Sequence, residues 1–140
     1  MSFVGSYTHT IDAKNRVFIP AKYREELGEE FYITRKFDGY LSVYTEEDWT
    51  AYVEKISKLP EIDANEIQEY ILAYAQKCSL DASGRIVLDE NLIKHASIKK
   101  NIVFVGSGRQ IRLWAEEVWT EREKNRDYEK MRRMMSQYGL

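Results

Sequence analysis

The 140-residue chain is long enough for one domain, or for two small halves that share a core. Its hydrophobic content of 44%, charged content of 31% and net charge of −2 exclude a disordered chain and disfavour a protein whose whole surface binds nucleic acid. With one cysteine, no apolar run of about 18 residues and no signal-peptide pattern, we expect a cytoplasmic protein without an internal disulfide or a membrane segment.

A nine-residue pattern occurs twice in the chain and indicates a duplication. Residues 12–20 read DAKNRVFIP, and residues 81–89 read DASGRIVLD. A second pair of blocks follows in the same order, LSVYTEEDW at 41–49 and IRLWAEEVW at 111–119. Internal repeats of this kind indicate that one structural unit is built twice. We expect a first unit over 1–60, a linking helix over 61–76 and a second unit over 77–140.

The first unit begins with a predicted strand near 6–11, followed by an Asp-x-x-Asn-Arg turn. Asn15 precedes the arginine of this turn, and Gly84 takes the same place in the second unit. Asn and Gly best tolerate a positive φ, so each turn is predicted to contain a left-handed residue. Alternating apolar residues after each arginine predict a second, short strand.

A short helix and a hairpin are predicted next. Within the motif at 12–24, Pro20 suits the first position of a helical turn, and Gly28 suits its C-terminal end. Alternating residues around the Asp38–Gly39 pair predict a β-hairpin over 31–44.

Each unit is predicted to end in a helix. Thr45 and Asp48 resemble a capping box, and a helix with an apolar face follows over 46–58. The second unit repeats these pieces as a motif over 81–93, a hairpin over 102–114 and one largely charged helix from about 116.

Neither unit is large enough to bury much apolar surface alone. We therefore expect an α+β fold in which the two units pair into one pseudo-two-fold β core with peripheral helices. The tandem motifs, DAKNRVFIPAKYR and DASGRIVLDENL, with a helical linker and a Trp-containing helix after each hairpin, resemble the MraZ family. These are bacterial transcriptional regulators of the division and cell-wall gene cluster. The resemblance covers essentially the whole chain.

The resemblance to the MraZ family implies a fold and an assembly. It implies two SpoVT/AbrB-type swapped-hairpin units that form a β-barrel core, and a ring-shaped homo-oligomer. It further implies a nucleoid-associated protein that binds double-stranded DNA at repeated sites upstream of its own operon, with repression as the expected outcome.

The family resemblance also implies which residues contact DNA. These contacts carry over onto the first turn, at Lys14, Asn15 and Arg16. Two positions depart from the family pattern, since Asn15 replaces a common Gly and Asp89 stands where the second copy often has Pro. The first departure keeps the left-handed turn, whereas the second weakens the expectation of a helical turn after Leu88.

Arg16 has two interpretations from the residues alone. Arginine can donate two hydrogen bonds to guanine O6 and N7, whereas lysine mainly supplies charge to phosphate. Arg16 can equally pair with Asp12 to brace the turn, and the two roles are compatible. The family resemblance favours DNA contact for Arg16.

The second turn lacks the basic neighbours of the first. Arg85 is the only basic residue between Ser83 and Ile93. We therefore expect a structural or subunit-contact role, rather than direct DNA contact, for Arg85. The same role is expected for the aspartates of both turns and for the glycine of the second turn: Asp12, Asp81 and Gly84.

Four further basic residues are secondary candidates for phosphate contact, and solvated surface charge is an equal alternative for each: Lys22, Arg24, Arg35 and Lys36. His9 precedes the basic turn and is expected to be partly buried or at the surface.

Enzymatic chemistry finds no support in the sequence. The two histidines and the cysteine lack metal-ligand spacing, and there is no Gly-rich phosphate loop or nucleophile elbow. We expect no catalytic residues, cofactor, metal or small-molecule substrate. The alternative to a DNA-binding regulator is an oligomeric interaction scaffold, or an antitoxin-like module, without specific DNA binding. The basic first turn favours the regulator.

Overall fold

The computed structural model describes residues 2–140, and both units follow one order of elements: strand, strand, short helix, strand, strand, helix. The strands are β1 (Ser6–Thr10), β2 (Arg16–Phe18), β3 (Glu30–Arg35), β4 (Leu41–Thr45), β5 (Gln76–Ser79), β6 (Arg85–Val87), β7 (Asn101–Gly106) and β8 (Ile111–Ala115). The helices are α1 (Ala21–Leu27), α2 (Glu46–Ser57), α3 (Glu61–Leu72), α4 (Glu90–His95), α5 (Glu116–Lys124) and α6 (Tyr128–Gln137). The fold is therefore α+β.

The two halves of the chain share one antiparallel sheet. Its strand order is β1-β7-β8-β4-β3-β5, so the hairpins β3–β4 and β7–β8 meet at the centre. The first strand of each half pairs with the hairpin of the other half, β1 with β7 and β5 with β3. The remaining strands, β2 and β6, pair with each other in a separate two-stranded ribbon. Strand exchange lets two small units bury one common core.

The main hydrophobic core is formed by residues of the ribbon together with residues of the sheet. Val17 and Ile19 after the first turn are buried, and so are their counterparts Ile86 and Leu88 after the second. This alternation is the burial pattern that the repeated apolar residues predict. A second cluster, centred on Trp49, packs α2 and α3 against the far side of the sheet.

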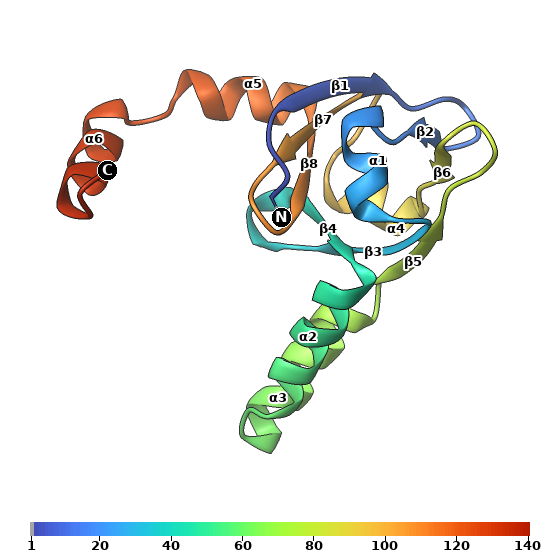
Figure 1. Cartoon of the computed structure of the whole chain (residues 1–140), viewed down its shortest axis with the longest axis horizontal. Coiled ribbons are helices and arrows are strands. Elements are labelled where there is room, and N and C mark those ends of the chain that lie inside the picture. Colours follow the sequence, from blue (N-terminus) through green and yellow to red (C-terminus); the bar gives the residue numbers. More distant parts are fainter. Residues whose placement is uncertain (1) are drawn as a thin grey trace.

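The helices fall into three groups (Figure 1). α1 and α4 lie against the strands near the ribbon, and α2 and α3 form an antiparallel helical arm that projects from the sheet. α5 continues from β8, and α6 stands away from the rest of the fold at the end of the chain. None of the helices within residues 2–140 combines the length and apolar character that crossing a membrane requires.

The predicted hairpin turn and helix cap are confirmed. Asp38 and Gly39 have φ values of 71° and 77°, the left-handed pair that suits a tight hairpin. The Thr45 hydroxyl accepts a hydrogen bond from the backbone N–H of Asp48 at 3.1 Å, which caps α2.

Two helix boundaries differ from the sequence-based expectation. Pro20 is the N-cap residue of α1 rather than its first helical residue, with φ −51° and ψ 131°. The linking helix, expected to reach Gln76, ends at Leu72 because Gln76 begins β5 and pairs with Ile33 of β3. The Gln76 side chain also donates to the Val87 carbonyl at 2.6 Å, so tertiary pairing overrides the helical pattern.

The C-terminal segment forms two helices instead of the single one expected. The break spans residues 125–127. The Asn125 side chain donates back to Glu121 at 2.8 Å, and the Asp127 carboxylate accepts from the backbone N–H of Lys130 at 2.9 Å. Short polar side chains compete with the helical backbone for hydrogen bonds, so this segment ends one helix and caps the next.

Candidate nucleic-acid interface

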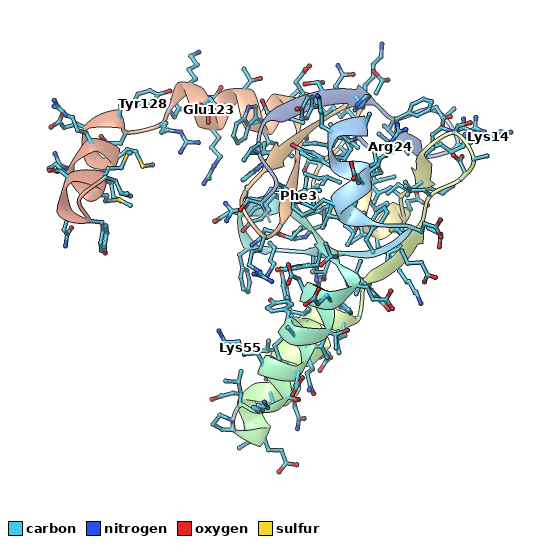
Figure 2. The ribbon with its side chains drawn as sticks, in the orientation of Figure 1. Phe3, Lys14, Arg24, Lys55, Glu123 and Tyr128 are labelled. Carbon is cyan, nitrogen blue, oxygen red and sulfur yellow. The ribbon has the colours of Figure 1, made fainter. Side chains whose placement is uncertain are left out.

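The first turn is organised by one carboxylate. Asp12 Oδ1 accepts the backbone N–H groups of Lys14 and Arg16, each at 2.9 Å. Asp12 Oδ2 accepts from Arg16 Nε at 2.7 Å. Asn15 has a φ of 62°, so the left-handed residue predicted before the arginine is confirmed. Figure 2 shows Lys14 at the outer edge of this loop, where its side chain is exposed.

The second turn repeats the first almost atom for atom. Asp81 Oδ1 accepts the backbone N–H groups of Ser83 and Arg85 at 2.9 Å, and Asp81 Oδ2 accepts from Arg85 Nε at 3.0 Å. Gly84 has a φ of 84° and confirms the left-handed position here too. Bracing by the aspartate is therefore common to both arginines, and it does not by itself distinguish a DNA-contacting turn from a structural one.

The bracing carboxylates are stabilised in their ionised form. Hydrogen bonds from the Arg16 backbone, followed by those from its side chain and from Lys14, hold the pKa of Asp12 below its ordinary value. The backbone of Arg85 has the same effect on the pKa of Asp81. Because both pKa values are depressed, the brace is intact at neutral pH and is lost only as the pH falls through these lowered values.

The two turns flank a single short ribbon. Arg16 pairs with Val87, and Phe18 pairs with Arg85, in the antiparallel register of β2 and β6. Directly opposed residues share one face of a ribbon, so both arginines lie on the same side. Phe18 and Val87 on this side are 42% and 56% exposed, whereas the alternate residues face the core. We call Arg16, Phe18, Arg85 and Val87 the ribbon face.

The ribbon face brings the two copies of the motif together, an arrangement that each turn taken alone does not predict. The Arg85 guanidinium carbon lies 5.6 Å from the centre of the Phe18 ring. Outside the paired residues, Ile19 N–H donates to the Gly84 carbonyl and Leu88 N–H to the Asn15 carbonyl. The repeat in the sequence could have predicted the pairing of β2 with β6, because two equivalent strands can pair antiparallel about a pseudo-two-fold axis.

Arg24 of α1 lies beside the second turn. Its Nε donates to the Ile19 carbonyl at 2.7 Å, and a Cβ added at Gly84 would overlap its guanidinium. The buried Gly84 thus leaves room for this guanidinium. Lys22 is exposed on α1, where it is available to solvent. His9 is partly buried, and burial, followed by the charge of Arg24, lowers its pKa, which favours the neutral imidazole.

The other two secondary candidates do not join the ribbon face. Arg35 donates from Nε to the Tyr70 carbonyl at 3.0 Å, and its guanidinium stacks over Tyr70 of α3 and over Tyr74, which follows the end of that helix. Lys36 donates to the Tyr52 hydroxyl of α2 at 2.8 Å. Both side chains therefore contact the helical arm of α2 and α3, and this arm lies on a different part of the molecule from β2 (Figure 1).

The described part of the chain, residues 2–140, contains no group of three or more His, Cys, Asp or Glu side chains placed to hold a metal ion. Cys78 is buried, and burial raises the pKa of its thiol to about 12. The ribbon face itself offers positive charge and hydrogen-bond donors from Arg16 and Arg85, and apolar contact from Phe18 and Val87.

Comparisons with known proteins identify similar chains. The family model described as "MraZ protein, putative antitoxin-like" matches residues 2–68 and 71–136, which are the two repeats. A protein of Clostridium tetani (strain Massachusetts / E88) called transcriptional regulator MraZ is 40% identical over 141 residues, covering 99% of each chain. Proteins of the same name are 44% identical in Thermoanaerobacter sp. (strain X514), over 89% of this chain and 88% of the relative. The relative in Lachnoclostridium phytofermentans is 41% identical, over 99% of this chain and 98% of the relative.

Proposed function

Because the chain belongs to the MraZ family, we propose that it is a transcriptional regulator that binds double-stranded DNA in a sequence-specific manner. The observation that carries this proposal is the braced first turn with an exposed lysine beside it. A net charge of −2 is compatible with DNA binding, since the potential needs to be positive only where the backbone phosphates approach.

Arg16 is the proposed base-reading residue. Asp12 engages only its Nε, and the two terminal nitrogens of Arg16 have no hydrogen-bond partner within residues 2–140. A guanidinium held at one nitrogen is oriented in advance, while its terminal nitrogens stay available for guanine O6 and N7. In this proposal Lys14 supplies phosphate charge, and Asn15 sets the left-handed turn between them.

The second turn takes a supporting part in the proposal. Arg85 has the same brace as Arg16, but Ser83 stands where the first turn has Lys14. Without a neighbouring lysine, Arg85 contributes less phosphate attraction. Its contact with Phe18 supports a role in holding the ribbon face in shape.

We further propose that the chain acts as a ring-shaped homo-oligomer of swapped-hairpin units and represses its own operon. The exchange of β1 and β5 between the halves supports the swapped-hairpin architecture. One turn offers few contacts, so a single subunit would bind weakly. Several first turns on one rim would gain affinity on tandem DNA repeats, because each later contact forms at high effective concentration.

A gel-shift experiment tests the proposal directly. We expect the wild-type protein to bind the DNA just upstream of its own gene at least about 10³-fold more tightly than scrambled DNA of equal length at physiological salt. Equal affinity for the two DNAs would contradict specific binding. That outcome, together with an oligomeric mass in light scattering, would favour an interaction scaffold.

Replacing Lys14 by alanine is expected to weaken binding to upstream and scrambled DNA alike. If Lys14 contacts phosphate, the slope of log affinity against log salt concentration should fall by about one for each subunit on the DNA. The matched control is Lys55→Ala, which removes an exposed lysine from the helical arm, far from Lys14 in Figure 2. A slope that changes equally in both variants would exclude this role for Lys14.

A further inference from the structure

Helix α6 carries an apolar stripe that its own chain does not cover. Met131, Met134, Met135 and Tyr138 follow the i, i+3, i+4, i+7 spacing of one helical face, and α6 has no buried residue. Met134 and Met135 are 42% and 45% exposed. A helix of ten residues is marginal in water by itself, so a partner that covers this stripe would stabilise α6. We call these four residues the α6 stripe.

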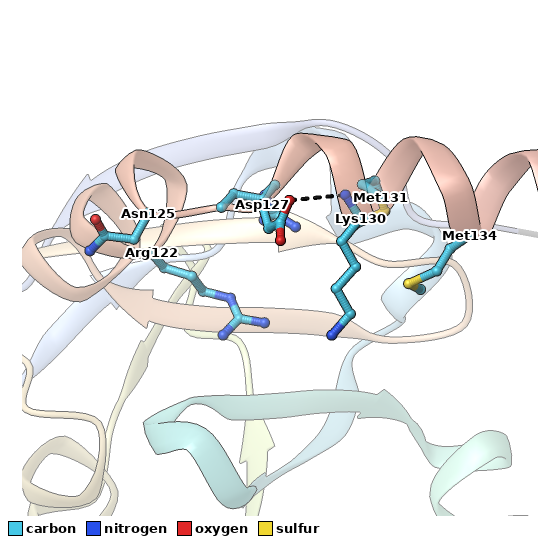
Figure 3. Close-up of a pocket in the computed structure, with 7 residues that line it drawn as sticks. Arg122, Asn125, Asp127, Lys130, Met131 and Met134 are labelled. Atoms are coloured by element: carbon cyan, nitrogen blue, oxygen red, sulfur yellow. Dashed lines mark hydrogen bonds between the residues drawn. The ribbon is translucent and has the colours of Figure 1, made fainter.

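The α6 stripe is bordered by positive charge. Figure 3 shows Arg122 of α5 and Lys130 of α6 extending to the same side of the two helices, around a cavity of about 480 Å³ that Met131 and Met134 also line. Across its full length α6 has three basic residues and one acidic residue. Its partner surface should therefore be apolar and acidic.

Helix α3 presents a surface of that kind. Its twelve residues, EIDANEIQEYIL, include four acidic side chains and no basic one. Ile62 and Ile67 are exposed among these carboxylates, with Ile62 80% exposed. Further round the helix, Glu66 and Ile67 border a cavity of about 450 Å³ that Lys36, Phe37 and Tyr70 also line. Ile62, Glu66 and Glu69 follow the i, i+4, i+7 spacing of one exposed helical face, and we call these three residues the α3 face.

The α6 stripe and the α3 face of one chain do not meet. In Figure 1 the helical arm projects below the sheet, whereas α6 stands apart at the left, beyond α5. Each surface is thus open to a second copy, and their charges are opposite. Exposed apolar patches bordered by charge are typical of protein–protein contacts.

We infer that α6 of one subunit docks on the α3 face of a neighbouring subunit. The Met and Tyr side chains of the stripe cover Ile62, while Lys130 and Arg133 lie opposite Glu66 and Glu69. Such a contact joins two different patches, so it is heterologous and is repeated head to tail until the rotation closes into a ring. The inference rests on the oligomer of the proposed function and not on DNA binding.

Charge reversal on each side provides the test. We expect both Lys130→Glu/Arg133→Glu and Glu66→Lys/Glu69→Lys to fall to the 16.6 kDa mass of one chain in light scattering, because like charges then face each other. An equimolar mixture of the two variants should regain the mass of the wild type, since each docking site in the mixture again joins opposite charges. All four side chains are exposed, and circular dichroism confirms that each variant is folded.

The matched control is Lys99→Glu/Lys100→Glu, which makes the same change in net charge as the α6 variant. Both lysines are exposed just before β7, whose first residue pairs with the end of β1, away from α3 and α6 (Figure 1). The control should keep the wild-type mass. The docking would be overturned if either charge-reversal variant kept that mass, if the mixture failed to assemble, or if the control dissociated. None of these three results would contradict the proposed oligomer itself. A monomeric wild type would overturn both the docking and the proposed oligomer.

Discussion

Arg16→Ala is expected to weaken the free energy of binding to the upstream DNA by about 1–3 kcal/mol for each guanine that its side chain reads. In an oligomer these losses add over the subunits that contact DNA. Affinity for scrambled DNA should change much less, because base readout and not phosphate attraction is removed. The physical reason is the free fork of the guanidinium, which Asp12 holds by Nε alone. Gel shifts on both DNAs at one fixed salt concentration measure the two effects separately.

Two matched variants sharpen the Arg16 experiment. Arg16→Lys keeps the charge and removes the planar fork, so it should bind scrambled DNA like the wild type and lose discrimination. Arg85→Ala removes an arginine with the same aspartate brace, and we expect the smaller decrease in affinity because Ser83 replaces Lys14 beside it. Equal decreases in Arg16→Ala and Arg85→Ala would contradict the asymmetry between the two turns. Unchanged binding in Arg16→Ala would remove the first turn from the interface.

Local features of this fold were predictable because they depend on neighbouring residues. Asn15 and Gly84 are left-handed because few other residues adopt that backbone, and Asp38 with Gly39 form the hairpin turn for the same reason. The buried alternation after each arginine follows from the strand period of two. The Thr45 cap needs only a hydroxyl and a backbone N–H three residues further on.

Features that depend on distant segments were not predictable from local patterns. The pairing of β2 with β6 places both arginines on one ribbon face, although Arg16 and Arg85 lie in different repeats. Arg35 and Lys36 follow the first turn closely in sequence, yet β3 carries them to the helical arm. The carboxylate of Asp127 restarts a helix inside a charged stretch whose composition indicates only one.

The same long-range packing determines how the ribbon face responds to substitution. Leu88 follows the second turn, is 0% exposed and donates its backbone N–H to the Asn15 carbonyl of the first turn. Its side chain is buried in the common core, and its backbone joins this segment to the first turn. We expect Leu88→Ala to lower the free energy of unfolding by about 2–5 kcal/mol, because removing the methyl groups leaves a cavity in a closely packed interior.

The adjacent residue provides the control for Leu88. Val87 is 56% exposed on the ribbon face, so Val87→Ala should change the free energy of unfolding by less than about 0.5 kcal/mol. Urea denaturation at one protein concentration compares the two variants, since subunit association would otherwise shift the midpoint. Equal destabilisation would mean that the ribbon does not face the core through Leu88. A large destabilisation by Leu88→Ala alone would show that the segment after the second turn is fixed by its buried side chain and not by the exposed ribbon face.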